Sequence, residues 1–245
     1  MEDIDLLKSD IWENLDSVES DQQKGLLPPE MQKAVPAGAT VVDLIPYEKL
    51  TVGRMPVIEA IAKRASRRNY TGESIDLETL SYLLWATQGV KKVAPNKWIQ
   101  RTVPSGGARH PFETYLLANK VEGLGYGLYR YLGIEHQLFL LSQEPALTKR
   151  IHKGTYNQFV MKSAVVFIWS AIPYRTEWRY TRASAKLIAQ DSGHLCQNLY
   201  IACESVGLGT CAIGAYNQKA MDAAIGIDGK DEFVIYMAPV GKVKG

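Results

Sequence analysis

Basic and hydroxyl side chains gather in one short segment, which contains Arg64, Ser66, Arg67 and Arg68 within five positions. The segment directly follows a helix-like apolar run. Guanidinium groups match phosphate oxygens in both shape and charge, so these residues are suited to binding a phosphate group. A solvated helix end is an equal alternative, because cations interact favourably with the negative end of the helix dipole.

A second segment suited to contact with a ligand is the Pro-Ser-Gly-Gly-Ala run at 104–108. Paired glycines let the backbone pass close to a flat molecule and present its N–H groups. Taken alone, an ordinary loop leading into a hairpin explains this segment better.

A third segment formally matches the G-x-G-x-x-A dinucleotide fingerprint at Gly207, Gly209 and Ala212. That fingerprint needs a strand before it and a helix after it. Here a long helix-like run precedes the glycines, and a strand-like run at 210–213 follows them. We therefore interpret the segment as a helix cap that leads into a backbone turn at Gly214.

Metal and thiol chemistry have weaker support. His194 and Cys196 lack a second pair of ligands at suitable spacing, so no metal site is predicted. Cys196 and Cys203 lie seven positions apart on one helix face, where core packing is the favoured interpretation. For Asp191, close to His194 on the same helix, we favour a core or capping hydrogen bond over a catalytic dyad.

The elements that must position these residues follow from hydrophobic periodicity. Pro56 opens a helix, and Asp76 caps a second helix that stops at Gly89. A long helix is predicted over 182–206, with Gly207 after it. Strands are predicted at 112–119, 127–132, 137–141, 164–171 and 232–239, and a short helix near 10–15. Because helices and strands do not alternate regularly, the sequence favours an α+β fold with a mainly antiparallel sheet.

Composition limits the classes of partner. The chain has 245 residues, 46% of them hydrophobic, and a formal net charge of +2. Lys and Arg are spread along the chain, which gives no support for nucleic-acid or membrane binding. No apolar run approaches the ~18 residues of a membrane span, and the acidic N-terminus does not resemble a secretory signal. Three cysteines without a CxxC pair favour a reducing, cytoplasmic compartment.

The chain divides into two parts. Residues 1–52 contain several prolines and too few apolar residues for a core, so we expect an N-terminal arm that packs on a dimer. Residues 53–245 are expected to form one cofactor-binding domain.

Taken together, these segments resemble the nitroreductase family. The run from Arg64 to Tyr70 is similar to its Arg-x-Ser-x-Arg-x-Tyr opening. The runs at 104–113, 191–198, 207–214 and 239–242 are similar to the branch related to the SagB-type dehydrogenases of peptide azoline biosynthesis. The resemblance covers roughly residues 54 to 242. It implies an α+β sandwich whose central antiparallel sheet is flanked by helices, and an intertwined homodimer with two FMN sites at its interface.

The resemblance also implies the residues that contact FMN. Arg64, Ala65 and Ser66 would surround the phosphate, and Lys242 would return to it. Arg68 would lie by the flavin N1 and the C2 carbonyl, where a cation stabilises the reduced ring. The residues expected to meet the ring from the other subunit are Pro104, Ser105, Gly106 and Gly107. The residues whose backbone would pass the N5 edge are Ile213, Gly214 and Ala215.

One position departs from the azoline-oxidising pattern. Those relatives carry a Lys-Tyr pair ahead of the long helix, and this chain has Trp178, Arg179 and Tyr180 there. Arginine stays protonated and is a poor general base, which argues against azoline oxidation. Tyr180 remains the candidate catalytic proton donor.

The leading hypothesis is an FMN-dependent oxidoreductase in which NAD(P)H reduces the flavin, and the flavin reduces a nitroaromatic or quinone-type acceptor. The alternative is an FMN-dependent dehydrogenase that oxidises an azoline or related peptide-derived substrate. A third interpretation is a flavin-binding protein without turnover. The expected partners are a second copy of the chain and a small-molecule substrate.

Overall fold

The computed structural model describes residues 3–13, 18–94 and 98–244. Within these ranges, seven strands form one antiparallel sheet in the order β1-β6-β5-β4-β7-β9-β8. The strands are β1 (Val41–Asp43), β4 (Phe112–Ala118), β5 (Gly127–Leu132), β6 (Gln137–Ser142), β7 (Val165–Ala171), β8 (Leu208–Thr210) and β9 (Phe233–Lys242). A separate hairpin pairs β2 (Val90–Ala94) with β3 (Trp98–Arg101). The predicted α+β fold with an antiparallel sheet is therefore confirmed.

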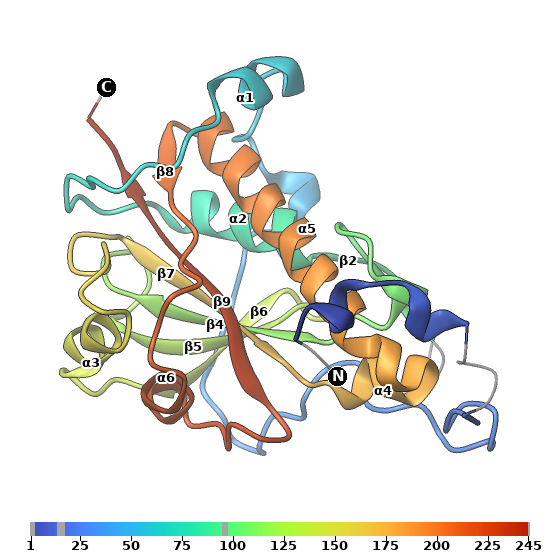
Figure 1. The fold of residues 1–245 in the computed structure, drawn as a ribbon. Helices are drawn as coiled ribbons and strands as arrows, with labels where there is room; N and C mark the ends of the chain where they lie inside the picture. The colour runs from blue at the N-terminus through green and yellow to red at the C-terminus, as the bar shows by residue number, and fades with distance from the viewer. Residues whose placement is uncertain (1–2, 14–17, 95–97, 245) are drawn as a thin grey trace.

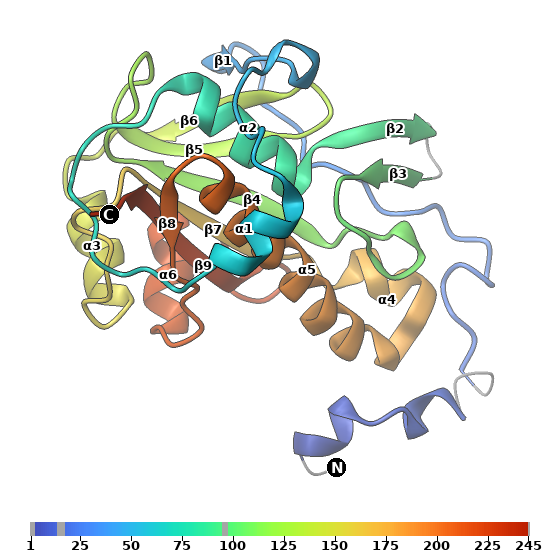
Figure 2. The same ribbon diagram turned by 90° about the horizontal axis from the view of Figure 1, so that it is seen from above.

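Helices cover both faces of the sheet (Figures 1 and 2). One face packs against α2 (Leu77–Gln88) and α5 (Ser184–Ser205), and the other against α3 (Leu147–Gly154) and α6 (Gln218–Ile225). The two shorter helices, α1 (Val57–Lys63) and α4 (Tyr174–Tyr180), both contact α5. Short 3₁₀ helices span Asp3–Leu7, Asp10–Trp12, Tyr47–Lys49, Gly106–Ala108 and Thr181–Ala183. No helix within the described ranges has the length and apolar character needed to cross a membrane.

The central strands β4, β5 and β7 are buried along their whole length because both faces of the sheet are covered. Successive side chains of a strand point to opposite faces. Accordingly, Leu116 and Phe167 belong to the core beneath α2 and α5, whereas Leu117 and Ile168 belong to the core beneath α3 and α6. All four side chains are fully buried.

The helix boundaries follow the predicted capping signals. The Asp76 carboxylate accepts a hydrogen bond from the Thr79 N–H at 2.7 Å, and α2 stops at Gly89. At the end of α5, Gly207 adopts a φ of 69°, a left-handed conformation that glycine takes without steric cost. Both predicted stops are confirmed.

Three details differ from the sequence-based expectation. The last strand continues past Pro239 to Lys242, because short β8 pairs along its outer edge. The strand predicted at 210–213 lies at Leu208–Thr210, with one further bridge from Ile213 to Met237. The helix predicted near 10–15 is a 3₁₀ helix at Asp10–Trp12, and residues 14 and 15 lie outside the described residues.

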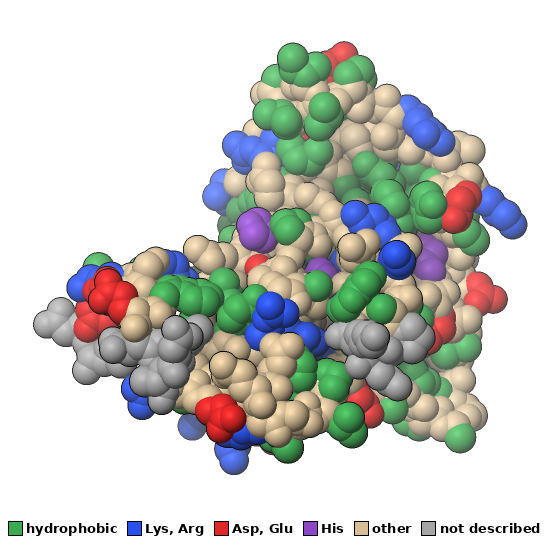
Figure 3. Space-filling view, turned by 90° about the vertical axis from the view of Figure 1, so that its right-hand side faces the viewer, with side chains coloured by type: hydrophobic (Ala, Val, Ile, Leu, Met, Phe, Trp, Pro, Cys, Tyr) green, Lys and Arg blue, Asp and Glu red, His purple; other side chains and the backbone are tan. Residues whose placement is uncertain are grey.

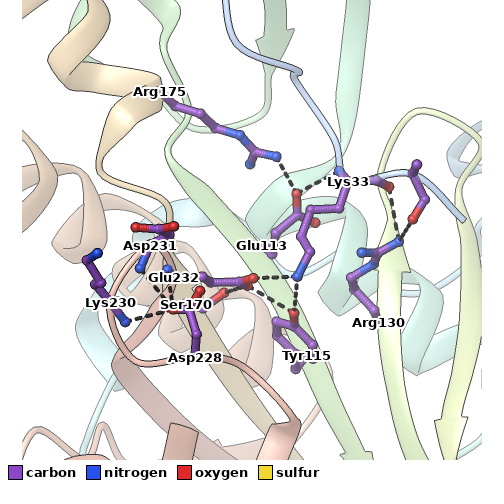
Figure 4. Close-up of polar contacts among 11 residues, drawn as sticks. Lys33, Glu113, Tyr115, Arg130, Ser170, Arg175, Asp228, Lys230, Asp231 and Glu232 are labelled. Atoms are coloured by element: carbon purple, nitrogen blue, oxygen red, sulfur yellow. Dashed lines mark hydrogen bonds and ion pairs between the residues drawn. The ribbon is translucent and has the colours of Figure 1, made fainter.

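The N-terminal segment is bound to the sheet by a charged network (Figure 4). The Lys33 ammonium contacts the Glu232 carboxylate and the Tyr115 hydroxyl, the latter at 3.1 Å. The Tyr115 hydroxyl itself donates to Glu232 at 2.9 Å. The Glu113 carboxylate accepts from the Lys33 N–H at 3.0 Å and from the Arg175 guanidinium at 2.5 Å. These contacts bind the segment to β4 and to the start of β9.

Two arginines extend the same network to the backbone of the segment. Arg130 donates to the carbonyl groups of Lys33 and Ala34 at 3.0 and 2.8 Å, and Arg175 donates to the Glu30 carbonyl at 2.8 Å. This part of the arm thus contacts its own chain. The expectation that residues 1–52 also pack on a second copy stays a prediction.

Breaking the buried ion pair should destabilise the protein strongly. Arg175 and Glu113 keep only 3% and 4% of their side-chain surface exposed. We expect Arg175→Met to lower the free energy of unfolding by about 3–5 kcal/mol, because it leaves a buried carboxylate without its counter-ion. Urea denaturation at fixed protein concentration measures the loss.

The matched control is the exposed ion pair between Arg150 and Glu144. Arg150→Met should change the free energy of unfolding by about 1 kcal/mol or less. Equal losses in the two variants would contradict the importance of the buried pair.

Candidate functional site

Three of the segments that the sequence identifies as candidates for ligand binding lie together at one edge of the sheet. Ser66 forms a parallel bridge with Thr210, and the Arg67 N–H donates to the Thr210 carbonyl at 2.9 Å. Thr210 ends β8, which pairs with the end of β9 through Gly209 and Gly241. The segment at 64–70, the turn at 207–214 and the C-terminal segment at 239–242 therefore form one site.

Two glycines permit this close approach. A Cβ atom on Gly209 would lie 2.7 Å from the Arg67 Cβ and 2.5 Å from a Val243 methyl carbon. A Cβ atom on Gly241 would lie 3.1 Å from the Tyr70 side chain. Any larger residue at Gly209 would push the basic segment away from the sheet.

Tyr200 of α5 joins two of the segments. Its hydroxyl lies 3.1 Å from the Ser66 hydroxyl and accepts a hydrogen bond from the Ala212 N–H at 2.8 Å. The Arg64 guanidinium lies over the same ring, 5.6 Å from its centroid. The sequence reasoning missed Tyr200, although the apolar face of α5 that contains Cys196 and Cys203 also includes position 200.

The arginines of the basic segment differ in their partners. Arg67 forms two hydrogen bonds with the buried Glu204 carboxylate, at 3.0 and 3.1 Å, and this interaction raises the pKa of Arg67. Arg64 is exposed and forms no ion pair with any described residue. Arg68 is also exposed; it lies 5.7 Å from the Phe159 ring centroid and donates to the Ser66 carbonyl at 3.4 Å. Arg67 is thus a structural residue, whereas Arg64 and Arg68 remain accessible.

A hollow of about 710 Å³ lies beside Arg68. Its lining includes Arg68, His152, Lys162 and Lys244, and no described acidic residue. Lys242, two residues before Lys244, is half-buried and lies 3.4 Å from the exposed Glu73 carboxylate. This edge of the molecule is therefore basic. The sequence reasoning included Lys242 but missed Lys244, although the Gly-Lys-Val-Lys run shows both.

The turn after β8 presents one accessible stretch of backbone. The Ile213 N–H donates to the Met237 carbonyl at 2.7 Å, so this amide is used within the sheet. The Ala215 carbonyl accepts a hydrogen bond from the Gln158 side chain at 2.8 Å. Gly214 between them is exposed, and a Cβ atom added to it would come no closer than 3.9 Å to Tyr236. Of the three predicted residues, Gly214 is the one that a flat ligand can approach most closely.

The loop at 104–108 is held by Asp191 of α5. The Ser105 hydroxyl donates to the Asp191 carboxylate at 2.6 Å, and the Gly106 N–H donates to it at 3.2 Å. Burial raises the pKa of Asp191, and its hydrogen bond with Ser105 opposes this shift. His194 lies 3.7 Å from the same carboxylate, through Nδ1. The predicted core hydrogen bond is therefore present, with the loop as its partner.

Gly107 and Tyr180 lie against each other. Gly107 has a φ of 57°, and a Cβ atom on it would lie 2.5 Å from the Tyr180 hydroxyl oxygen. The Tyr180 ring packs edge-on against Trp12, with 5.8 Å between the ring centroids. The structure thus brings together the predicted loop and the candidate proton donor.

The two groups of predicted residues lie along different parts of α5. Asp191, which holds the loop, and Tyr200, which holds the basic segment, are nine positions apart on this helix. An α-helix rises 1.5 Å per residue, so the two anchors are about 13 Å apart. Within one chain, the loop with Tyr180 and the group formed by Arg64, Ser66 and Lys242 are therefore separate.

The cysteines lie in the core. All three are buried and free, and burial raises the pKa of the Cys196 thiol to about 12. A thiol with such a pKa is a poor nucleophile at neutral pH. The packing interpretation of Cys196 and Cys203 is confirmed by their membership of the core beneath α2 and α5.

Comparisons with known proteins identify relatives of this chain. The chain is 29% identical over 184 residues to a protein of Methanocaldococcus jannaschii named as a nitroreductase, a match that covers 75% of this chain and 89% of the relative. It is 25% identical over 162 residues to the trifolitoxin-processing protein TfxB of Rhizobium leguminosarum bv. trifolii. That second match covers 63% of this chain but only 43% of TfxB.

A solved structure shows the same fold. A Ralstonia eutropha protein described as a nitroreductase superimposes with a TM-score of 0.70 at 24% identity, covering 90% of this chain and 95% of that one. The model of the nitroreductase family matches residues 61–242, which include the basic segment, the loop, the turn and Lys242. This chain therefore belongs to the nitroreductase family.

Proposed function

We propose that the chain is an FMN-dependent oxidoreductase that uses NAD(P)H to reduce a small electrophilic acceptor of the nitroaromatic or quinone type. Members of its family generally bind FMN and use NAD(P)H. The observation that carries the proposal is the meeting of the segments that contain Arg64, Ser66 and Lys242 beside the exposed turn at Gly214. Bound FMN would supply the hydride and electron transfer, and the protein would supply position and electrostatics.

The donor groups fit this cofactor. A phosphate monoester is a strong acceptor with close to two negative charges, and charge-assisted hydrogen bonds bind it best. Arg64 and Lys242 would provide the cations, and the Ser66 hydroxyl a further donor. Ala65, between Arg64 and Ser66, would lie beside the phosphate, while its N–H donates to the Glu204 carboxylate at 3.4 Å. Arg68 would hold the pyrimidine side of the flavin ring.

A second function has one specific observation in its favour, the similarity to TfxB. It would be FMN-dependent oxidation of an azoline or related peptide-derived substrate. In this chain, Arg179 precedes Tyr180, and an arginine does not serve as a general base. We therefore rank NAD(P)H-dependent reduction first, with Tyr180 as the proton donor to the acceptor.

We further propose that two copies of the chain form each complete site. The loop residues Pro104, Ser105, Gly106 and Gly107 are anchored at Asp191, about 13 Å along α5 from the Tyr200 anchor of the basic segment, so the two groups are separate within one chain. The exposed apolar side chains of α1 support a large interface: Val57, Ile58 and Ile61 are 66%, 75% and 60% exposed. Hydrophobic side chains cover the top of the molecule in Figure 3, where Figure 1 places α1. We also infer a reducing, cytoplasmic setting, which three free buried cysteines support.

The purified protein should be yellow and should release FMN on denaturation. Anaerobic NADH or NADPH should then bleach the flavin, and a nitroaromatic or quinone acceptor should restore the colour. Stopped-flow absorbance at a flavin wavelength measures both steps. A bound flavin that neither nucleotide reduces would reject this function and favour peptide oxidation or binding without turnover. Release of FAD would reject the cofactor assignment.

Arg64 and Arg67 should contribute differently to FMN binding. We expect Arg64→Ala to raise the FMN dissociation constant by one to two decades, because a charge-assisted hydrogen bond contributes roughly 1.5–3 kcal/mol. Arg67→Ala should change affinity much less but should lower stability, because Glu204 then loses its partner. FMN titration of each apo variant, corrected for its folded fraction, gives the comparison. Equal losses of affinity would show that the register of the motif is wrong.

Assembly and cofactor retention should depend on each other. We expect a homodimer whose dissociation releases FMN, and Ile58→Glu should promote dissociation by placing a charge in the apolar interface. Sedimentation over a range of protein concentrations, followed at a flavin wavelength, measures both quantities. Glu59→Gln, on the same helix, is the control and should remain dimeric. A monomer with full FMN occupancy would refute the shared site.

A further inference from the structure

A second hollow lies beside the loop and Tyr180, away from the basic segment. Its volume is about 460 Å³. Its walls come from β3, from the loop, from α4 and from the N-terminal segment, and they include Trp98, Gly107, Arg109, Trp178 and Arg179. No acidic residue is among its described lining residues.

Arg109 is the unusual member of this lining. The residue is only 6% exposed, and its Nε atom is buried without a hydrogen-bond partner. The guanidinium lies over the Trp178 ring, 4.9 Å from the centroid, and it forms no ion pair with any described residue. A buried cation without a counter-ion is costly, so a negatively charged ligand would compensate a charge that the described residues leave unpaired.

Arg179 adds a second positive charge at the same place. Burial lowers the pKa of Arg109, and the charge of Arg179 lowers it further, which shows that the two cations influence each other. Arginine nevertheless remains protonated at neutral pH. The Arg179 guanidinium lies 5.4 Å from the Tyr180 ring centroid. The cationic hollow is therefore adjacent to the candidate proton donor.

The other walls suit a flat body. Trp98 and Trp178 provide aromatic surface, and Gly107 contributes backbone without a side chain. Figure 3 shows the side of the molecule on which Figure 1 places α4 and β2, with Lys and Arg side chains near its centre and hydrophobic side chains around them. The combination of two arginines with aromatic walls is suited to a planar molecule with a carboxylate group.

We propose that this hollow binds the carboxylate of the acceptor, so that the preferred acceptors are planar carboxylic acids. The proposal rests on the proposed function and deepens it by naming the substrate class. Arg109 would hold the carboxylate through its fork of N–H donors, and Arg179 would strengthen the attraction. The electrophilic group of the acceptor would then point toward the loop and Tyr180.

The test compares 4-nitrobenzoate with the uncharged 4-nitrobenzamide. Isothermal titration of the oxidised holoenzyme, without NAD(P)H, measures binding in the absence of turnover. We expect the wild-type protein to bind the carboxylate about tenfold to a hundredfold more tightly, as a charge-assisted hydrogen bond would give. Arg109→Gln and Arg179→Gln should each reduce this preference to about threefold or less. Arg182→Gln, an exposed neighbour outside the lining, should keep it.

A folding check on each variant and a second measurement, of kcat/KM, accompany the titration. Arg179 is exposed, so Arg179→Gln is expected to fold even if Arg109→Gln does not, and thermal melting checks both. The ratio of kcat/KM for the two acceptors, with saturating NADH or NADPH, should follow the binding ratio. A change confined to the preference for NADPH over NADH would assign the arginines to the nucleotide and overturn the proposal.

The remaining outcomes separate the two proposals. Reduction of both acceptors without any preference for the carboxylate would overturn the anionic subsite and leave the oxidoreductase function standing. Selective binding of 4-nitrobenzoate without flavin reduction by either nucleotide would support the subsite and reject the oxidoreductase function. A preference that persists in both arginine variants would also overturn the subsite.

Discussion

Side chains of α5 fix the positions of the segments that make up the candidate site. Asp191 binds the loop through Ser105, Tyr200 binds Ser66 and the turn after β8, and Glu204 binds Arg67. A buried helix of 22 residues is stiff, so the distances between these anchors are set by the helical rise rather than by the loops themselves. The position of a bound cofactor relative to these segments would therefore depend on the spacing of the anchors along α5.

The same helix explains why neighbouring arginines have unlike roles. Arg67 points back to Glu204, so its charge is neutralised inside the protein. Arg64 lies over the Tyr200 ring, where a cation is attracted to the aromatic face without losing its hydrogen-bond donors. The protein thus holds one guanidinium in place and keeps another available. The Arg-x-Ser-x-Arg-x-Tyr motif leaves Arg67 at a variable position, and its contacts with Glu204 give it a structural role.

Much of the fold could be predicted because the signals were local. The cap at Asp76, the stop at Gly207 and the strands at 112–118 and 165–171 depend on short-range stereochemistry and on mostly apolar runs. The motif order included Arg68 and Lys242 of the basic edge but missed Lys162 and Lys244. Helices α3, α4 and α6, each of seven or eight residues, were not predicted, although the Asn217 side chain caps α6. Pro239 was taken as the end of its strand, although the pairing of β8 extends that strand to Lys242.

The sequence could not show which residues far apart in the chain contact each other. Tyr200 and Glu204 looked like ordinary members of a long amphipathic helix, and nothing local reveals that they bind residues about 135 positions earlier. Arg109 follows the glycine loop, but only the packing of α4 and β3 around it shows that no described residue is its counter-ion. Long-range polar contacts of this kind are decided by tertiary packing.

The network around Lys33 has a consequence for the synthesis of the chain. Lys33 and Glu232 are separated by 199 residues, so their contact forms only after β9 has left the ribosome. At roughly 5–20 residues per second, the N-terminal segment therefore waits about 10–40 s before its last partner is available. During that interval the N-terminal arm cannot form all of its contacts with the rest of the chain. The completion of folding is thereby tied to the synthesis of β9.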